Sequence, residues 1–222
     1  MKKGRNLRSV NADGGVNLQF KLLSAIGIII IVSGHCYHGG MELAYNWFPP
    51  YSYNLALFVF ISGYFYKTDY EENVGKYIWK RTKRLLIPAY LWNIFYGGMV
   101  AFLGLFGFTI GAKPDLYNLF VMPFVDGEAF QYNLGSWFVY PLFLVCIINV
   151  LFRKFLKLIH FDNEFIVLIV YLAIGMIGIN TALENPTAIN GIVKLLVRTM
   201  FFLPCYEFGR FYKAVLEKKD TL

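Results

Sequence analysis

Long apolar stretches without charged residues recur along the chain. Five of them contain no Asp, Glu, Lys or Arg: 22–41, 43–66, 85–112, 129–152 and 165–183. A helix needs about 20 apolar residues to cross a bilayer. The stretches are continuous and lack the alternation of polar and apolar positions that a barrel strand requires, so each predicts a membrane-spanning helix.

A sixth apolar segment, 190–210, differs because two cations, Lys194 and Arg198, lie within it. With this segment included, we expect an all-α transmembrane helical bundle of about six spans. The spans are expected near 22–38, 52–66, 85–107, 134–152, 164–180 and 190–210.

The segments outside the spans also carry information. Loop 67–84 holds both signs of charge and is expected to face water and be partly helical, while 108–133 has room for an interfacial or re-entrant piece. The expected organisation is a loose cytoplasmic N-terminal segment 1–17, a transmembrane domain 18–213 and a cytoplasmic tail 214–222.

The composition excludes a soluble globule. The chain is 57% hydrophobic and 16% charged, whereas soluble domains carry about 25% charged residues. The net charge of +7 would suit a nucleic-acid partner. However, the basic residues gather in the connections between spans and form no separate basic and aromatic surface, so no nucleic-acid partner is expected.

Lys and Arg are concentrated in alternate connections. They gather before the first span, in 67–84, in 153–157 and after 209, whereas the other connections hold mainly acidic residues. This positive-inside bias predicts that both termini are cytoplasmic. The expected location is therefore the cell membrane, in a multi-pass arrangement, with the lipid bilayer as a partner.

The three cysteines, Cys36, Cys146 and Cys205, lie in or at the ends of apolar stretches. Their spacing fits neither a metal site nor a disulfide framework, so they are expected to pack as small apolar residues. His35 and His38 flank Cys36 but provide too few ligands for a metal. No metal is expected.

One histidine lies inside an apolar span. His35 follows Lys21 by fourteen residues, about 21 Å along a helix, which places it in the outer part of the bilayer. Because a polar side chain is costly there, it should face the bundle interior or a wet cavity. An imidazole at that place can abstract a proton near neutral pH or simply hydrogen-bond between helices, and position alone favours neither role.

A basic group lies just before the third span. Arg81 and Arg84 are three residues apart and so share one face of a helix, which Lys80 joins. Guanidinium groups suit phosphates because they form bidentate hydrogen bonds. The alternative is that these cations only set the topology.

Five short motifs stand in a characteristic order and spacing: Gly34-His35, 58–64 (FVFISGY), 80–90 (KRTKRLLIPAY), 136–142 (SWFVYPL) and Gly209-Arg210. Together they resemble the membrane-bound acyltransferase-3 family of bacterial cell envelopes, over about residues 18–213.

The resemblance implies an acyltransferase of groups other than aminoacyl groups. It would move an acyl group, with acetyl favoured, from cytoplasmic acyl-CoA to a hydroxyl of an extracytoplasmic envelope glycan. It implies that His35 is the catalytic base and that Arg81 and Arg84, with Lys80, face the donor phosphates. The implied donor substrate is acyl-CoA, with acetyl-CoA favoured, and the implied partners are this donor and the glycan.

The sequence departs from the family in two ways. The family usually has an Arg eleven positions before the His, where this chain has Ser24. Family members also commonly have more spans, so a fragment, a degenerate paralogue and a short variant all remain open. The alternatives to an active enzyme are a non-catalytic, degenerate or truncated acyltransferase-like membrane protein, and a small transporter.

Arg198 is a second candidate catalytic residue. It precedes Arg210 by twelve residues, about 18 Å along a helix, so its predicted depth is close to that of His35. Its guanidinium could stabilise negative charge on the carbonyl oxygen during acyl transfer. The alternative is that it snorkels outward together with Lys194, four residues earlier on the same face.

Overall fold

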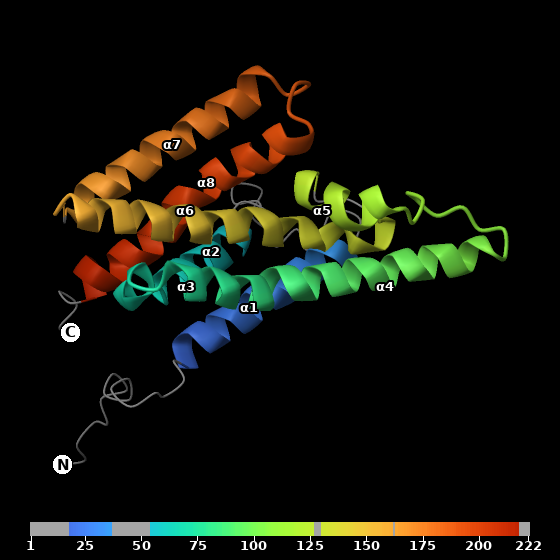
Figure 1. Ribbon diagram of the computed structural model, residues 1–222, viewed down its shortest axis with the longest axis horizontal. Coiled ribbons are helices and arrows are strands. Elements are labelled where there is room, and N and C mark those ends of the chain that lie inside the picture. Colours follow the sequence, from blue (N-terminus) through green and yellow to red (C-terminus); the bar gives the residue numbers. More distant parts are fainter. Residues whose placement is uncertain (1–17, 37–53, 127–129, 162, 218–222) are drawn as a thin grey trace, which may run out of the picture.

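The computed structural model describes residues 18–36, 54–126, 130–161 and 163–217, and every regular element in these ranges is helical (Figure 1). The longer helices are α1 (Leu18–Cys36), α2 (Asn54–Tyr64), α3 (Val74–Arg81), α4 (Ile87–Gly104), α6 (Val139–Leu158), α7 (Glu164–Glu184) and α8 (Gly191–Phe211). The short elements are η2 (Thr68–Glu71), η3 (Thr82–Leu86), η4 (Tyr117–Val121), α5 (Met122–Val125), η5 (Gln131–Phe138) and η6 (Tyr212–Leu216). The prediction of an all-α fold is confirmed.

Three helices in the described ranges are long and apolar enough to cross a membrane: Val74–Gly104, Gly135–Leu158 and Glu164–Glu184. Shorter apolar helices cover Leu18–Val32 and Asn54–Tyr64. The transmembrane character of the bundle therefore has direct support. The number of spans and the side on which the termini lie stay predictions.

The third span begins earlier than its charge-free stretch suggests. α3, η3 and α4 form one continuous helix, Val74–Gly104. The sequence predicted that 67–84 is partly helical, and the helix covers this segment from Val74 onward. Pro88 therefore lies inside this helix and not near its start. It has no N–H for the carbonyl of Arg84, four residues earlier, and the helix widens into a π-turn in which the Ile87 N–H bonds the Thr82 carbonyl.

The fourth span also extends past its apolar stretch. Helix α6 continues to Leu158, so that Arg153, Lys154 and Lys157 lie on a helix and not in a connection between spans, where the sequence placed them. Cations are good helix formers, and near a helix C-terminus they also interact favourably with the helix dipole.

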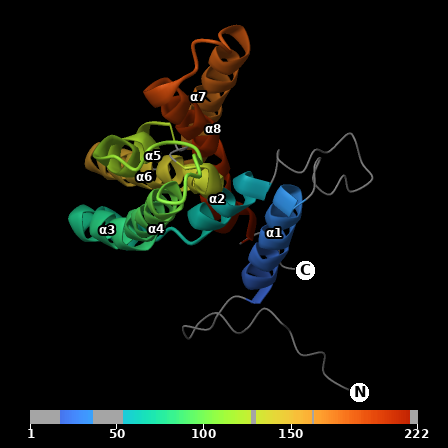
Figure 2. The ribbon, with the colours of Figure 1, turned by 90° about the vertical axis from the view of Figure 1, so that its right-hand side faces the viewer.

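Helix α8 is the centre of the bundle, with α2, α6 and α7 packed around it. α7 and α8 form an antiparallel pair, and α3–α4 runs along α6 (Figure 1). α1 lies at the edge of the bundle against α2 (Figure 2). We call the end that gathers Lys80, Arg81, Arg153 and Arg210 the basic end, and the other end the far end.

Two motif glycines explain the close crossing of α2 and α8. A Cβ on Gly63 would overlap the backbone carbonyl of Tyr206, and a Cβ on Gly209 would overlap that of Phe60. Glycine lets two helix backbones approach closely in a membrane bundle. The 58–64 motif and the Gly209-Arg210 motif, distant in sequence, thus form one contact.

The core lies between α6, α7 and α8, where Tyr140, Val145, Val150, Tyr171 and Tyr206 are almost completely buried. Cys146 is buried in the same cluster, as expected of a small packing residue.

Candidate active site

Lys80, Arg81 and Arg84 line one cavity at the basic end. Its volume is about 200 Å³, and its wall also includes Ser62 of the 58–64 motif and the rings of Tyr70 and Tyr77. Positive charge and hydrogen-bond donors from α2 and from the α3–α4 helix therefore meet around one space.

Arg81 is the most fixed of the three cations. Arg81 is half-buried, whereas the sequence predicted that this segment faces water. Its Nε donates to Tyr77 Oη at 3.1 Å, and its guanidinium lies 5.1 Å from the Tyr77 ring centre. Tyr77 is itself held in the core, with its Oη 3.4 Å from Tyr206 Oη. Arg84 and Lys80 are exposed, and Lys80 Nζ lies 5.3 Å from the Tyr70 ring centre.

A second cavity, of about 320 Å³, begins at Arg84 and follows α4. Trp92 and Tyr96 line it on α4, and Asn133 and Ser136 line it from η5. Arg84 and Tyr96 are twelve residues apart, about 18 Å along a helix. Arg84 lines both cavities, and from this residue the second cavity extends along α4 toward the far end.

The end of this second cavity is polar and well fixed. Ser136 Oγ donates to the Asn133 carbonyl at 3.0 Å, and Asn133 Nδ2 donates to Asn93 Oδ1 at 3.1 Å. Asn93 in turn donates to the Leu119 carbonyl at 2.8 Å. This network attaches the helical segment Tyr117–Val121 of the long connection, where the sequence predicted an interfacial or re-entrant piece, to α4 and η5.

Arg198 packs against protein at the far end. Its guanidinium carbon lies 4.0 Å from the Trp137 ring centre, and Nη1 donates to the Asp126 carbonyl at 3.4 Å. Lys194 Nζ lies 3.5 Å from Asp126 Oδ1. Both cations of the sixth apolar segment are thus connected to the same residue of the long connection.

His35 lies in the last turn of α1, and its side chain, like all of His38, is outside the described residues. α1 and α2 are antiparallel, because the rings of Phe20 and Tyr64 are 4.1 Å apart and Gly27 faces Phe58. His35 therefore follows Gly27 toward the far end. Its convergence with Arg198 stays a prediction.

Ser24 does not replace the family Arg. Its hydroxyl donates to the Phe20 carbonyl of its own helix at 2.7 Å. A serine bonded to its own backbone supplies no positive charge to a neighbouring site.

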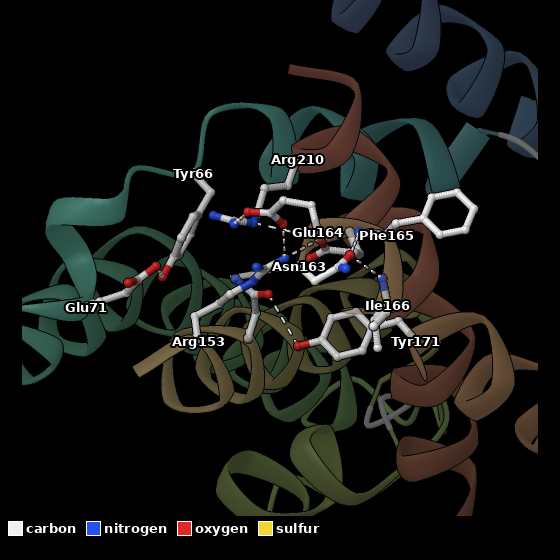
Figure 3. Close-up of polar contacts among 11 residues, drawn as sticks. Tyr66, Glu71, Arg153, Asn163, Glu164, Phe165, Ile166, Tyr171 and Arg210 are labelled. Carbon is white, nitrogen blue, oxygen red and sulfur yellow. Dashed lines mark hydrogen bonds and ion pairs between the residues drawn. The ribbon is translucent and has the colours of Figure 1, made fainter. Parts of the chain in front are cut away.

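A buried charged cluster, which the sequence did not predict, joins three helices at the basic end (Figure 3). It consists of Arg153 on α6, Glu164 on α7, and Glu207 and Arg210 on α8. Arg153 contacts Glu207 and lies 2.7 Å from Glu164, and Arg210 contacts Glu164 and lies 3.8 Å from Glu207. Two positive and two negative side chains thus neutralise one another in the bundle interior.

Two residues after α2 extend this cluster. Tyr66 Oη donates to Glu71 Oε1 at 3.3 Å, and the Arg210 guanidinium lies 5.5 Å from the Tyr66 ring centre.

The sequence contained one signal for the charged cluster. Arg153 and Arg210 fit the topology bias, which hid their pairing. Glu207, however, is an acidic residue within an apolar segment and lies three residues before Arg210, on the same helix face.

The all-helical bundle and its long apolar helices are those of an integral membrane protein, and this one has a basic pocket at one end. Within this class, a family model described as an acyltransferase domain, Acyl_transf_3, matches residues 17–222. The chain belongs to the acyltransferase-3 family, and its domain is that of a transferase. No curated protein and no solved structure matches it.

Proposed function

We propose that the protein transfers an acyl group from acyl-CoA, bound at the basic end, to a hydroxyl of an acceptor at the far end. The observation that carries the proposal is the convergence of Lys80, Arg81 and Arg84 on one cavity, with a second cavity that shares Arg84 and lies along α4. The charge bias predicts that the basic end is cytoplasmic, where acyl-CoA is found.

The basic pocket suits the phosphates of CoA. Arg81 is held by Tyr77, so its guanidinium is oriented before a ligand arrives. The exposed side chains of Arg84 and Lys80 add positive charge that attracts a phosphate. The pantetheine arm of the donor would then lie in the apolar cavity along α4, with the thioester toward Asn133 and Ser136.

The chemistry proposed for the far end is a direct transfer. His35 takes the proton of the acceptor hydroxyl, and the oxygen attacks the thioester carbonyl carbon. The carbon–sulfur bond breaks, the CoA thiolate leaves, and an ester forms. Arg198 would stabilise the negative charge that develops on the carbonyl oxygen. The acyl group favoured is acetyl, and the acceptor is an envelope glycan.

Reconstituted protein tests this proposal. Proteoliposomes would be supplied with labelled acetyl-CoA on the face of the basic end and with envelope glycan on the other face. Mass spectrometry of the glycan should detect a new ester with wild-type protein and none with His35→Ala. If wild-type protein binds acyl-CoA but transfers nothing to any glycan tested, the alternative of a non-catalytic acyltransferase-like protein holds.

A further inference from the structure

Arg81 differs from the two arginines of the charged cluster because no carboxylate lies beside it. Its side chain is half-buried, and the ion pairs among the described residues do not include it. Arg153 and Arg210, by contrast, each contact a glutamate. The described residues that line the basic pocket around Arg81 include no acidic side chain either. A partly buried cation without a counter-charge is costly, and its positive charge stays available to an anionic ligand.

A short chain of phenols holds this guanidinium. Arg81 Nε donates to Tyr77 Oη at 3.1 Å, and Tyr77 Oη lies 3.4 Å from Tyr206 Oη. Because the Tyr77 oxygen accepts from Arg81, its own hydrogen is free to point to Tyr206. Both tyrosines are almost completely buried. A buried hydroxyl needs a partner, so each oxygen restricts where the other can lie.

Tyr206 is fixed in turn by the crossing of α2 and α8. Its backbone carbonyl lies where a Cβ on Gly63 would overlap it. Its ring is 0% exposed and packs against Tyr66, with the ring centres 6.4 Å apart. Tyr77 lines the basic pocket, whereas Tyr206 does not. Tyr206 therefore acts on a ligand in that pocket through Tyr77 and not by direct contact.

We propose that Tyr206 is a positioning residue of the donor site: it fixes the Tyr77 hydroxyl, which orients Arg81 for the phosphates of acyl-CoA. With Nε bonded to Tyr77, the two terminal nitrogens of the guanidinium remain for a bidentate contact with one phosphate. A carboxylate in place of the phenol would also hold Arg81 but would neutralise its charge. The inference rests on the proposed function, since it concerns how that donor is held.

Tyr206→Phe tests this role because it removes one oxygen and keeps the ring. The measurement is calorimetric titration of the full chain in nanodiscs with acetyl-CoA. Loss of the supporting hydrogen bond should weaken binding about three- to tenfold. Tyr171→Phe is the matched control, because Tyr171 is buried in the same cluster and its hydroxyl donates to Asn149. The affinity of this control should match wild type.

A double-mutant cycle separates positioning from a general loss of stability. Arg81→Gln alone should weaken binding about tenfold to a hundredfold, because a charge-assisted contact is lost. Adding Tyr206→Phe to this variant should cause no further loss, since no guanidinium remains to be orientated. A general loss of stability would instead lower the affinity by the same factor with and without Arg81. Tyr77→Phe removes the acceptor of Arg81 directly and should match Tyr206→Phe.

Four outcomes would overturn the positioning role. Tyr206→Phe binds acetyl-CoA as tightly as wild type, its loss adds to that of Arg81→Gln, Tyr171→Phe loses as much, or Tyr206→Phe does not fold. In all four cases wild-type protein still binds the donor. Wild-type protein that does not bind acetyl-CoA would overturn the proposed function itself, so the two failures are distinguishable.

Discussion

Arg153 on α6 contacts Glu207 on α8 in the interior of the bundle, and their side chains are 5% and 0% exposed. Arg210 and Glu164 complete the neutral charged cluster. A buried charge whose partner is removed destabilises a fold strongly, whereas an exposed pair contributes little. The cluster therefore joins α6, α7 and α8 at the basic end, and removal of one of its members should destabilise the fold.

Replacing Glu207 with Gln leaves Arg153 and Arg210 facing one carboxylate in place of two. Unfolding in detergent, followed by circular dichroism, should show that the free energy of unfolding falls by about 3–5 kcal/mol. The control is Lys157→Gln, which breaks a 3.6 Å pair with Glu72 whose side chains are 55% and 67% exposed. That change should cost at most about 1 kcal/mol, and equal losses would contradict a stabilising role for the cluster.

Gly63→Ala should separate α2 from α8, because the new Cβ would overlap the Tyr206 carbonyl. The expected loss of stability is about 1–3 kcal/mol. Gly98→Ala is the matched control, since a Cβ added at Gly98 would meet nothing within 4 Å. In a helix interior, that control should gain about 0.5–1 kcal/mol. Similar thermal unfolding of the two variants would argue against a tight crossing.

Arg84→Gln should weaken acyl-CoA binding by about 1.5–3 kcal/mol, because a charge-assisted hydrogen bond is lost. Arg84 is exposed, so the fold should survive. Lys83→Gln removes a neighbouring charge that lines neither cavity, and its affinity in calorimetry should match wild type. Unchanged binding by Arg84→Gln would mean that this residue only sets the membrane topology. Arg81→Gln is the second test, and it also removes the hydrogen bond from Arg81 to Tyr77.

The predicted topology places Lys76 and Asp126 on opposite sides of the membrane. Single cysteines at these positions, in a background without native cysteines, should react with an impermeant maleimide from opposite faces. The charge bias predicts labelling of position 126 from outside whole cells and of position 76 only after permeabilisation. The reverse pattern, or labelling of both from outside, would refute the assignment of the donor side.

His35 and Arg198 are predicted to lie at a similar depth and to share one cavity. Cysteines at these two positions should crosslink through a short bifunctional reagent, whereas cysteines at Lys21 and Arg198 should not. Arg198→Gln should then lower the turnover number with little loss of folded protein. If the two positions cannot be crosslinked, the proposed catalytic pairing is wrong.

The sequence by itself determined the helical character of the chain and the approximate position of its helices. Continuous apolar runs in a bilayer leave the backbone no partners except its own, so they must form helices. The three-residue spacing of Arg81 and Arg84 likewise predicted that they share one helix face. In the structure both line the same cavity as Lys80.

Helix ends were less predictable because hydropathy reports contact with lipid and not backbone hydrogen bonding. Arg84 ends the apolar stretch of the third span, but the helix continues past it in the N-terminal direction and begins at Val74. Only the full structure showed that Pro88 is accommodated by a π-turn inside this continuous helix.

Tertiary structure alone decided which charges meet. Arg153 and Glu207 are 54 residues apart in sequence, and although Glu207 stands out as an acidic residue within an apolar segment, nothing in the sequence links it to Arg153. Their pairing depends on how α6 and α8 pack against each other in the bundle. Such long-range geometry leaves no periodic pattern in the sequence, because electrostatic pairing depends on distance in space and not on spacing along the chain.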